Sequence, residues 1–303
     1  MEFSKLIDHG FYWLIRRPIN KIIELAYLKI PLAFCKRENV KNEKVTIGIV
    51  DIIVISYNNE RIINIQIDKL RKYFKDAFCL TIADNSTDKL KAIQIQEICI
   101  EKNIRYIKLP RQNYFKGSAS HGIALNWVYK NYIKKRQPEY FGFLDHDLFP
   151  VANISVRAIL EKQWYFGLRH YGINAKNKNV WDANTPIFWY LWAGLCFFKT
   201  SCLQNKKVNF MHCTVHSTFF DTGGANWGNL YSKDNTLNYY FPIWKRIKIG
   251  TGENRQSDFI DFIDDRWVHT INWSHWYTLE NKEKKIEDIL QTFELNIIEG
   301  KNF

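Results

Sequence analysis

The chain has 303 residues, of which 46% are hydrophobic and 24% charged, and its 43 Lys and Arg against 31 Asp and Glu give a net charge of +12. This composition excludes a disordered chain, and no apolar run approaches the roughly 20 residues that a membrane-spanning helix needs. The positive charge fits nucleic acid, an anionic membrane or an acidic substrate as a partner, and it fits a solvated lysine-rich surface equally well.

Residues 1–44 are predicted to form an amphipathic helical extension followed by a linker. Apolar residues recur at helical spacing from Phe3 to Ile15, Pro18 interrupts the pattern, and a second stripe runs from Ile22 to Ile30. Seven basic residues against three acidic ones give the segment 1–37 a charge of +4. A basic amphipathic helix either lies on an anionic membrane or packs against the body of the protein, and the pattern leaves both open.

The chain is expected to be cytoplasmic, and membrane binding by the basic helix would place it peripherally at the inner face of the membrane. Charged residues interrupt the apolar residues near the N-terminus, so no cleavable secretion signal is predicted. The six cysteines form no Cys-x-x-Cys pair, which is typical of reduced, buried thiols.

Residues 45–150 alternate apolar runs with amphipathic helical stripes. The runs cover 49–56, 78–83, 104–109 and 140–144, and the helical stripes cover 63–74, 90–98 and 118–133. Such alternation predicts an α/β fold with a mixed, mostly parallel sheet flanked by helices. Residues 151–278 are less regular and rich in aromatic side chains, and residues 279–303 are expected to form a C-terminal helix and tail.

Polar side chains follow three of the predicted strands. They lie in the segments 56–60, 84–88 and 145–147. Because ligands of an open parallel sheet bind beyond the carboxyl ends of its strands, these segments are predicted to share one crevice. The first turn lacks the glycine fingerprint of dinucleotide sites. Asn85 or Ser86 together with Asp88 also suits a helix cap, a role that is compatible with ligand binding.

Asp145 and Asp147 are the sharpest chemical signal in the sequence. Two carboxylates at alternate positions of an extended chain lie on the same side and can reach a divalent cation together. Mg²⁺ or Mn²⁺ held by such a pair completes its coordination with water and phosphate oxygens. His146 between them would point the other way and is not assigned to the metal.

Several segments resemble, in their order and spacing, the nucleotide-sugar half of GT-A fold glycosyltransferases, especially those of family 2. They are 54–60, 83–88 and 143–147, together with 117–126, which is similar to the small-residue helix before the metal motif, and 192–194, which looks like the acceptor-side glycine segment. The resemblance covers about residues 45–200 well. It implies a GT-A-like, Rossmann-type fold whose nucleotide-sugar half is 45–150 and whose acceptor half is 151–278.

The resemblance also implies roles for individual residues. The expected nucleotide-sugar contacts are Ser56, Tyr57, Asn59, Glu60, Asp84, Asn85, Lys116 and Asp145, and the expected acceptor contacts are Trp192 and Gly194. Asp145, Asp147 and His269 would hold Mn²⁺ or Mg²⁺, with His275 as the alternative to His269. The family's Glu-Asp pair has no clear copy here. Asp221 is the candidate general base, and an Asp before two glycines suits a turn equally well.

The implied activity is transfer of a sugar from a nucleotide-diphosphate sugar, preferably a UDP-sugar, to a hydroxyl of a glycan or lipid-linked acceptor. Metal dependence and inversion of the anomeric centre are expected, and nucleic acid is not expected as a partner. The competing hypothesis is a non-catalytic basic protein that binds nucleic acid, a membrane surface or carbohydrate. His212, Cys213 and His216 could begin a zinc site, but no matching second pair follows them.

Overall fold

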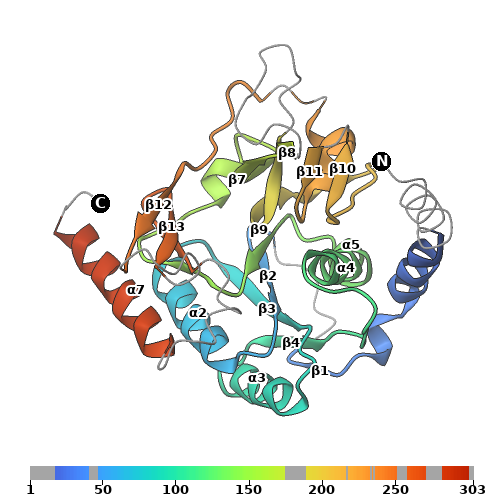
Figure 1. Cartoon of the computed structure of the whole chain (residues 1–303), viewed down its shortest axis with the longest axis horizontal. Helices are drawn as coiled ribbons and strands as arrows, with labels where there is room; N and C mark the ends of the chain where they lie inside the picture. The colour runs from blue at the N-terminus through green and yellow to red at the C-terminus, as the bar shows by residue number, and fades with distance from the viewer. Residues whose placement is uncertain are drawn as a thin grey trace, which may run out of the picture.

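The computed structural model describes residues 18–40, 47–174, 189–215, 218–232, 234, 236–250, 258–270 and 282–299. At its centre is a seven-stranded sheet with the order β1-β4-β3-β2-β5-β9-β7 (Figure 1). Four neighbouring strands are parallel: β4 (Arg105–Lys108), β3 (Phe78–Asp84), β2 (Val50–Ser56) and β5 (Tyr140–Asp145). The strands β1 (Arg37–Glu38), β9 (Trp189–Lys199) and β7 (Tyr165–Tyr171) pair antiparallel at the two edges. The predicted mixed α/β sheet is confirmed.

Helices cover both faces of this sheet, as the uninterrupted burial of β2 requires. On one face, Ile52 and Val54 pack in a core with α2 (Glu60–Tyr73) and α3 (Lys89–Glu101). On the other face, Ile53 and Ile55 pack with α4 (Ser118–Val128). The π-helical turn η2 (Tyr129–Ile133) and the short α5 (Lys134–Arg136) continue α4. The alternation of strand side chains therefore divides the core into two layers.

A second sheet of four antiparallel strands stands beside the first. Its order is β12 (Trp244–Lys248), β13 (Phe259–Ile263), β14 (Trp267–His269) and β6 (Leu148–Pro150). The C-terminal helix α7 (Lys282–Ile298) packs on one face of it, where the ring centroids of Phe262 and Phe293 are 4.7 Å apart. Because β6 follows β5 directly, this sheet is joined to the carboxyl end of the central sheet.

The remaining elements are short. A three-stranded sheet contains β10 (Cys213–Val215), β11 (Thr218–Phe220) and β8 (Ile173–Asn174). The helical turns are η1 (Leu32–Phe34), α6 (Arg157–Leu160), η3 (Thr200–Leu203), η4 (Gly224–Asn226) and η5 (Trp227–Tyr231). All six cysteines are free thiols.

The helix at residues 18–29 uses one side for packing and leaves apolar side chains exposed on another. Tyr27 is buried, and Trp127 Nε1 donates a hydrogen bond of 2.9 Å to the carbonyl of Ile30 just beyond the helix. Ile19, Ile22 and Leu25 are exposed by 43%, 65% and 46%. Residues 1–17, which contain the first predicted stripe, lie outside the described residues. Within the described ranges, no helix has the length and hydrophobicity that crossing a bilayer requires.

Candidate functional site

Asp145, Asp147 and His269 converge at the carboxyl end of β5. Asp145 ends β5 and Asp147 precedes β6, and the pairing of β6 with β14 brings His269 beside them. The backbone N–H of Thr270 donates to the carbonyl of Asp147 at 3.0 Å. Ligand atoms of the three side chains all lie within 4.8 Å of one another. The structure therefore brings together the three residues expected to bind a metal.

Helix α2 supports the turn that carries the two aspartates through hydrogen bonds. The buried side chain of Gln66 donates hydrogen bonds to the carbonyls of Asp145 and Leu148, at 2.6 and 2.8 Å. This amide fixes the backbone on both sides of the Asp-His-Asp segment. The Nδ1 atom of His146 lies 3.3 Å from the carbonyl oxygen of Ile55. Gln66 carries no functional signal in the sequence, because its partner backbone groups are about eighty residues away.

The charges of the three side chains depend strongly on one another. Burial and the charge of Asp147 raise the pKa of Asp145, while His121, whose Nε2 lies 3.5 Å from Asp145 Oδ1, opposes that shift. Burial alone would lower the pKa of His269, but nearby carboxylates outweigh it and raise that pKa to about 10. Burial likewise opposes the ionisation of Asp147, yet His269 holds the pKa of this carboxyl below its usual value. The two aspartates thus concentrate negative charge at this point, and the positive charge of His269 offsets part of it.

This set of donors fits a small divalent cation. Ligand atoms of an octahedral ion lie about 3.0 Å apart when adjacent and about 4.2 Å apart when opposite, so three atoms within 4.8 Å of one another can reach one ion after the side chains adjust. Two carboxylates suit Mg²⁺ and Mn²⁺, and the added imidazole favours Mn²⁺ because Mg²⁺ prefers oxygen ligands. Within the described part of the chain, no other group of His, Cys, Asp and Glu has this spacing. His216 of the alternative zinc pattern and His275 lie outside the described residues.

Two residues beside the cluster were not singled out from the sequence. Asp261 Oδ2 lies 3.6 Å from His269 Nδ1, and Arg246 Nε lies 3.0 Å from Asp261 Oδ1. A signal for Asp261 was present, because a hairpin that turns at residues 264–266 pairs Ile263 with Trp267 and hence Asp261 with His269. No local pattern indicated that this hairpin stands beside Asp147.

Aromatic rings form a wall next to His269. The ring centroid of Trp192 is 4.7 Å from that of His269. Trp192 also stacks on His170, with ring centroids 5.6 Å apart and an interplanar angle of 10°. Trp192 is only 8% exposed. A Cβ atom at Gly194 would lie 2.2 Å from the Trp192 ring, so the glycine makes room for the tryptophan. Packing therefore explains Gly194, and acceptor contact by either residue stays a prediction.

Asp221 opens a turn beside the same wall. Its Oδ1 accepts hydrogen bonds from the backbone N–H and the hydroxyl of Thr222, at 2.8 and 3.2 Å, and Gly223 adopts a φ of +98°. The alternative role of Asp221 in a turn is therefore present. Burial lowers the pKa of His170 to about 4, and the charge of Asp221 acts against that shift. Asp221 thus lies within electrostatic reach of the wall, and its role as a base stays a prediction.

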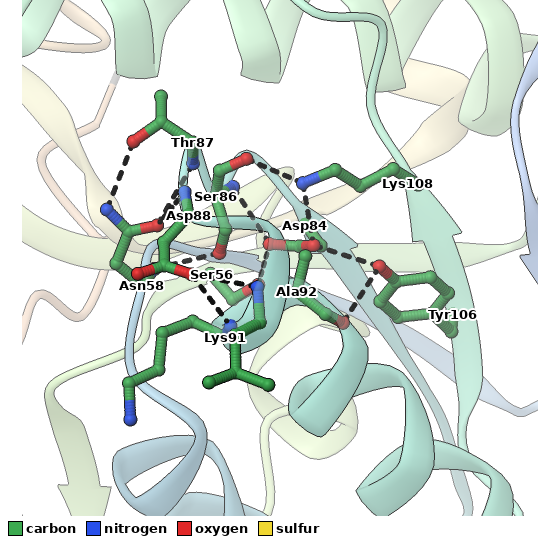
Figure 2. A network of polar contacts seen from close by, with 11 residues as sticks. Ser56, Asn58, Asp84, Ser86, Thr87, Asp88, Lys91, Ala92, Tyr106 and Lys108 are labelled. Carbon is green, nitrogen blue, oxygen red and sulfur yellow. Dashed lines mark hydrogen bonds and ion pairs between the residues drawn. The ribbon is translucent and has the colours of Figure 1, made fainter.

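Asp84 is the centre of a buried network at the ends of β3 and β4 (Figure 2). Its Oδ1 accepts hydrogen bonds from Ser56 Oγ and the Ser86 backbone N–H, at 3.2 and 2.8 Å. Its Oδ2 accepts from Tyr106 and Lys108 Nζ, at 2.9 and 2.8 Å. Neither Ser56 nor Asp84 has exposed surface. Direct contact of these two side chains with a nucleotide, as the sequence predicts, would require the network to open.

The other predicted nucleotide contacts differ in what they do. Asn59 caps α2 by accepting from the backbone N–H of Ile62 at 3.1 Å, and Glu60 forms an ion pair of 2.7 Å with Lys91. The side-chain amide of Asn85 donates a hydrogen bond of 3.1 Å to Ser120 on α4. The cap of α3 is Asp88, whose Oδ1 accepts from the backbone N–H of Leu90 at 2.8 Å. Tyr57 and Lys116 are exposed side chains at the start of α2 and of α4. Tyr57 and Lys116 are thus the most exposed of the predicted nucleotide contacts.

A cavity of about 310 Å³ opens beside the Asp84 network. Its lining includes Asn85, Ser86, Lys89, Lys108 and Arg111. None of Asp145, Asp147 and His269 lines it. The basic side chains make this part of the sheet edge attractive to anions.

No family model matches the chain, and no curated protein matches it. Among solved structures, S. aureus TarS 1–349 in complex with UDP-GlcNAc is similar over 52% of this chain and 46% of its own, with 20% identity and a TM-score of 0.34. WbbM, a bifunctional glycosyltransferase, is similar over 55% of this chain and 34% of its own, with 12% identity and a TM-score of 0.36. The chain spans less than half the length of these structures.

Proposed function

We propose that the chain is a metal-dependent glycosyltransferase that uses a nucleotide-diphosphate sugar. The observation that carries this proposal is the convergence of Asp145, Asp147 and His269 at the carboxyl end of the central strands. The order and spacing of the sequence segments 54–60, 83–88 and 143–147 support the same class. A UDP-sugar is the preferred donor, and a glycan or lipid-linked hydroxyl is the acceptor.

Each group of residues has a distinct part in the proposed reaction. Asp145, Asp147 and His269 hold Mn²⁺ or Mg²⁺, and such an ion neutralises a diphosphate leaving group. Tyr57, Asn85 and Lys116 flank the donor, and the Asp84 network keeps the intervening loops in place.

Asp221 is the proposed general base. It takes the proton of the acceptor hydroxyl as the new bond to the anomeric carbon forms and the bond to the diphosphate breaks, with inversion. A positioned base of this kind contributes on the order of 10²–10⁴-fold to the rate. In the Asp221→Asn variant we therefore expect slow transfer with donor binding retained.

The proposal is tested by thermal unfolding with UDP-, GDP-, CMP- and dTDP-sugars, with and without Mn²⁺. A donor at a hundredfold excess over its dissociation constant stabilises the folded state by about 2.7 kcal/mol. We expect a UDP-sugar to produce this shift only with Mn²⁺, and Asp145→Asn and Asp147→Asn to abolish it. Asp68→Asn is the matched control, because Asp68 lies on α2, is exposed and forms an ion pair with Lys102. The absence of a shift with every donor would contradict the proposal.

The exposed apolar stripe on the helix at residues 18–29 supports a peripheral position at the inner face of a membrane. Ile19, Ile22 and Leu25 face solvent, and Lys21 and Lys29 are exposed on the same helix. A helix of this kind lies in the interface of an anionic leaflet. This position would bring the site close to lipid-linked acceptors.

A further inference from the structure

Arg246, Asp261 and His269 form a row across three adjacent strands. In the register of the second sheet, Arg246 on β12 pairs with Asp261 on β13, and Asp261 pairs with His269 on β14. Directly paired residues of antiparallel strands point to the same face, so the three side chains lie side by side. The row continues to the metal cluster, because His269 Nε2 is 3.6 Å from Asp147 Oδ1.

Asp261 contacts both of its neighbours through its carboxylate. Arg246 Nε lies 3.0 Å from Asp261 Oδ1, and a second guanidinium nitrogen lies 3.4 Å from Oδ2. The same Oδ2 lies 3.6 Å from His269 Nδ1. Arg246 is 51% exposed, whereas Asp261 is 13% and His269 is 12% exposed. The carboxylate is thus fixed from its solvent side and touches the imidazole on its protein side.

The opposite face of the sheet holds this row in place. Phe262 and Val268, which alternate with Asp261 and His269, are buried in the cluster that includes α7. A shift of β13 or β14 by one residue would turn these apolar side chains outward and the charged ones into the core. The packing of α7 therefore keeps Asp261 and His269 on the opposite face of the sheet, and the pairing of β13 with β14 places them side by side.

In a histidine that binds a metal, the contact made by one ring nitrogen determines where the other ring nitrogen points. A carboxylate at one nitrogen fixes the ring orientation and leaves the other nitrogen directed at the metal. Here Nδ1 faces Asp261, and Nε2 faces Asp147. This arrangement matches a histidine ligand whose ring is oriented by a carboxylate at Nδ1, with Nε2 on the side of the candidate cation site.

We propose that Asp261, held by Arg246, is a positioning residue that orients His269 so that Nε2 faces the cation site. This inference rests on the proposed function of Asp145, Asp147 and His269 as a cation site. Because Arg246 lies on the exposed edge strand β12, this strand contributes to the cation site without supplying a ligand.

The test measures Mn²⁺ affinity of the full chain by the electron paramagnetic resonance signal of free Mn²⁺. Loss of a partner that orients a ligand weakens metal binding by about 10–100-fold, which we expect for Asp261→Asn. In the His269→Gln background, Asp261→Asn should change the affinity less than about twofold, since residues that act through one another are not additive. Asp265→Asn on the same hairpin is the control, because Asp265 is 76% exposed and pairs only at the surface with Lys245.

Each outcome has one meaning. If the wild type binds no Mn²⁺, the cation site is wrong and this inference falls with it. If the wild type binds Mn²⁺ and the Asp261→Asn variant binds it equally well, the positioning role is overturned while the cation site stands. The same conclusion follows if Asp261→Asn lowers the Mn²⁺ affinity as much in the His269→Gln background as it does in the wild type. If Asp261→Asn does not fold, Arg246→Gln decides, because this exposed side chain can be replaced without opening the core. A smaller loss of Mn²⁺ affinity supports the role, and unchanged affinity overturns it.

Discussion

At the scale of single residues, Asp84 determines how several chain segments meet. Its two oxygens accept four hydrogen bonds from β2, β4 and the loop after β3 (Figure 2). A buried carboxylate is stable only with such partners. The loops that carry Tyr57 and Asn85 therefore depend on a residue that is itself hidden.

We expect Asp84→Asn to lower the free energy of unfolding by about 2–3 kcal/mol. The amide cannot accept all four hydrogen bonds, and it leaves the ammonium group of Lys108 without its charge partner. Urea unfolding measures the loss. Asp68→Asn, in an exposed ion pair, should cost less than about 0.5 kcal/mol. Equal losses in the two variants would show that the network contributes no special stability.

Gly194 is a second residue whose role depends on a neighbouring ring. Gly194→Ala would place a methyl group 2.2 Å from Trp192, so we expect a destabilisation of about 1–3 kcal/mol and a displaced ring. Gly228→Ala is the matched control, since its added Cβ meets nothing within 4 Å. Urea unfolding compares the two, and a Gly194→Ala chain as stable as the wild type would contradict the packing role.

At the scale of elements, α7 supports the site by covering the apolar face of the second sheet. Its attachment to α2 includes a charge cluster in which Glu294 binds Lys69 and lies 3.2 Å from Lys72. Burial would raise the pKa of Glu294, but these lysines outweigh it and hold that pKa below its usual value. Because the folded state lowers this pKa, the stabilisation is present above the usual pKa of a glutamate and is lost as the pH falls through the lowered one.

We therefore expect Glu294→Gln to cost about 1 kcal/mol at pH 7 and markedly less near pH 3, below the usual pKa of a glutamate, where part of the ionic stabilisation is already lost. Unfolding by urea at the two pH values measures the difference between variant and wild type. Glu287→Gln, at an exposed position of the same helix, is the control and should cost little at either pH. A cost of Glu294→Gln that is as large at pH 3 as at pH 7 would contradict the ionic origin.

At the scale of the whole molecule, the proposed membrane contact depends on the exposed apolar stripe of the helix at residues 18–29, and the net charge of +12 is compatible with it. The helix at residues 18–29 is also attached to the core through Tyr27. Deleting it would therefore uncover buried side chains, and substitutions on its exposed side are the cleaner change.

We expect replacement of Ile19, Ile22 and Leu25 by serine to weaken binding to phosphatidylglycerol vesicles by at least about tenfold, because less apolar surface leaves water. Vesicle sedimentation measures the bound fraction. The control replaces three exposed apolar side chains of α3, namely Leu90, Ile93 and Ile100. If the two triple variants bind vesicles alike, the helix does not mediate membrane binding.

The sequence by itself determined the central strands and helices, because apolar periodicity is a local property. The expected runs at 49–56, 78–83 and 140–144 correspond to β2, β3 and β5. The same reasoning placed Asp145 and Asp147 at the end of a strand, and the family resemblance supplied His269. These predictions depend on residues close together in the chain or on a pattern of motifs.

Only the tertiary structure decided which distant groups meet at the site. Asp84 is buried beneath Lys108, Gln66 holds the Asp-His-Asp turn, and His269 lies beside Asp147 because β14 pairs with β6. Each of these contacts follows from strand order and register, which are determined by the packing of whole layers rather than by neighbouring residues. A polar residue in a sequence shows what chemistry is available, and its long-range partners determine whether that chemistry faces a ligand or the core.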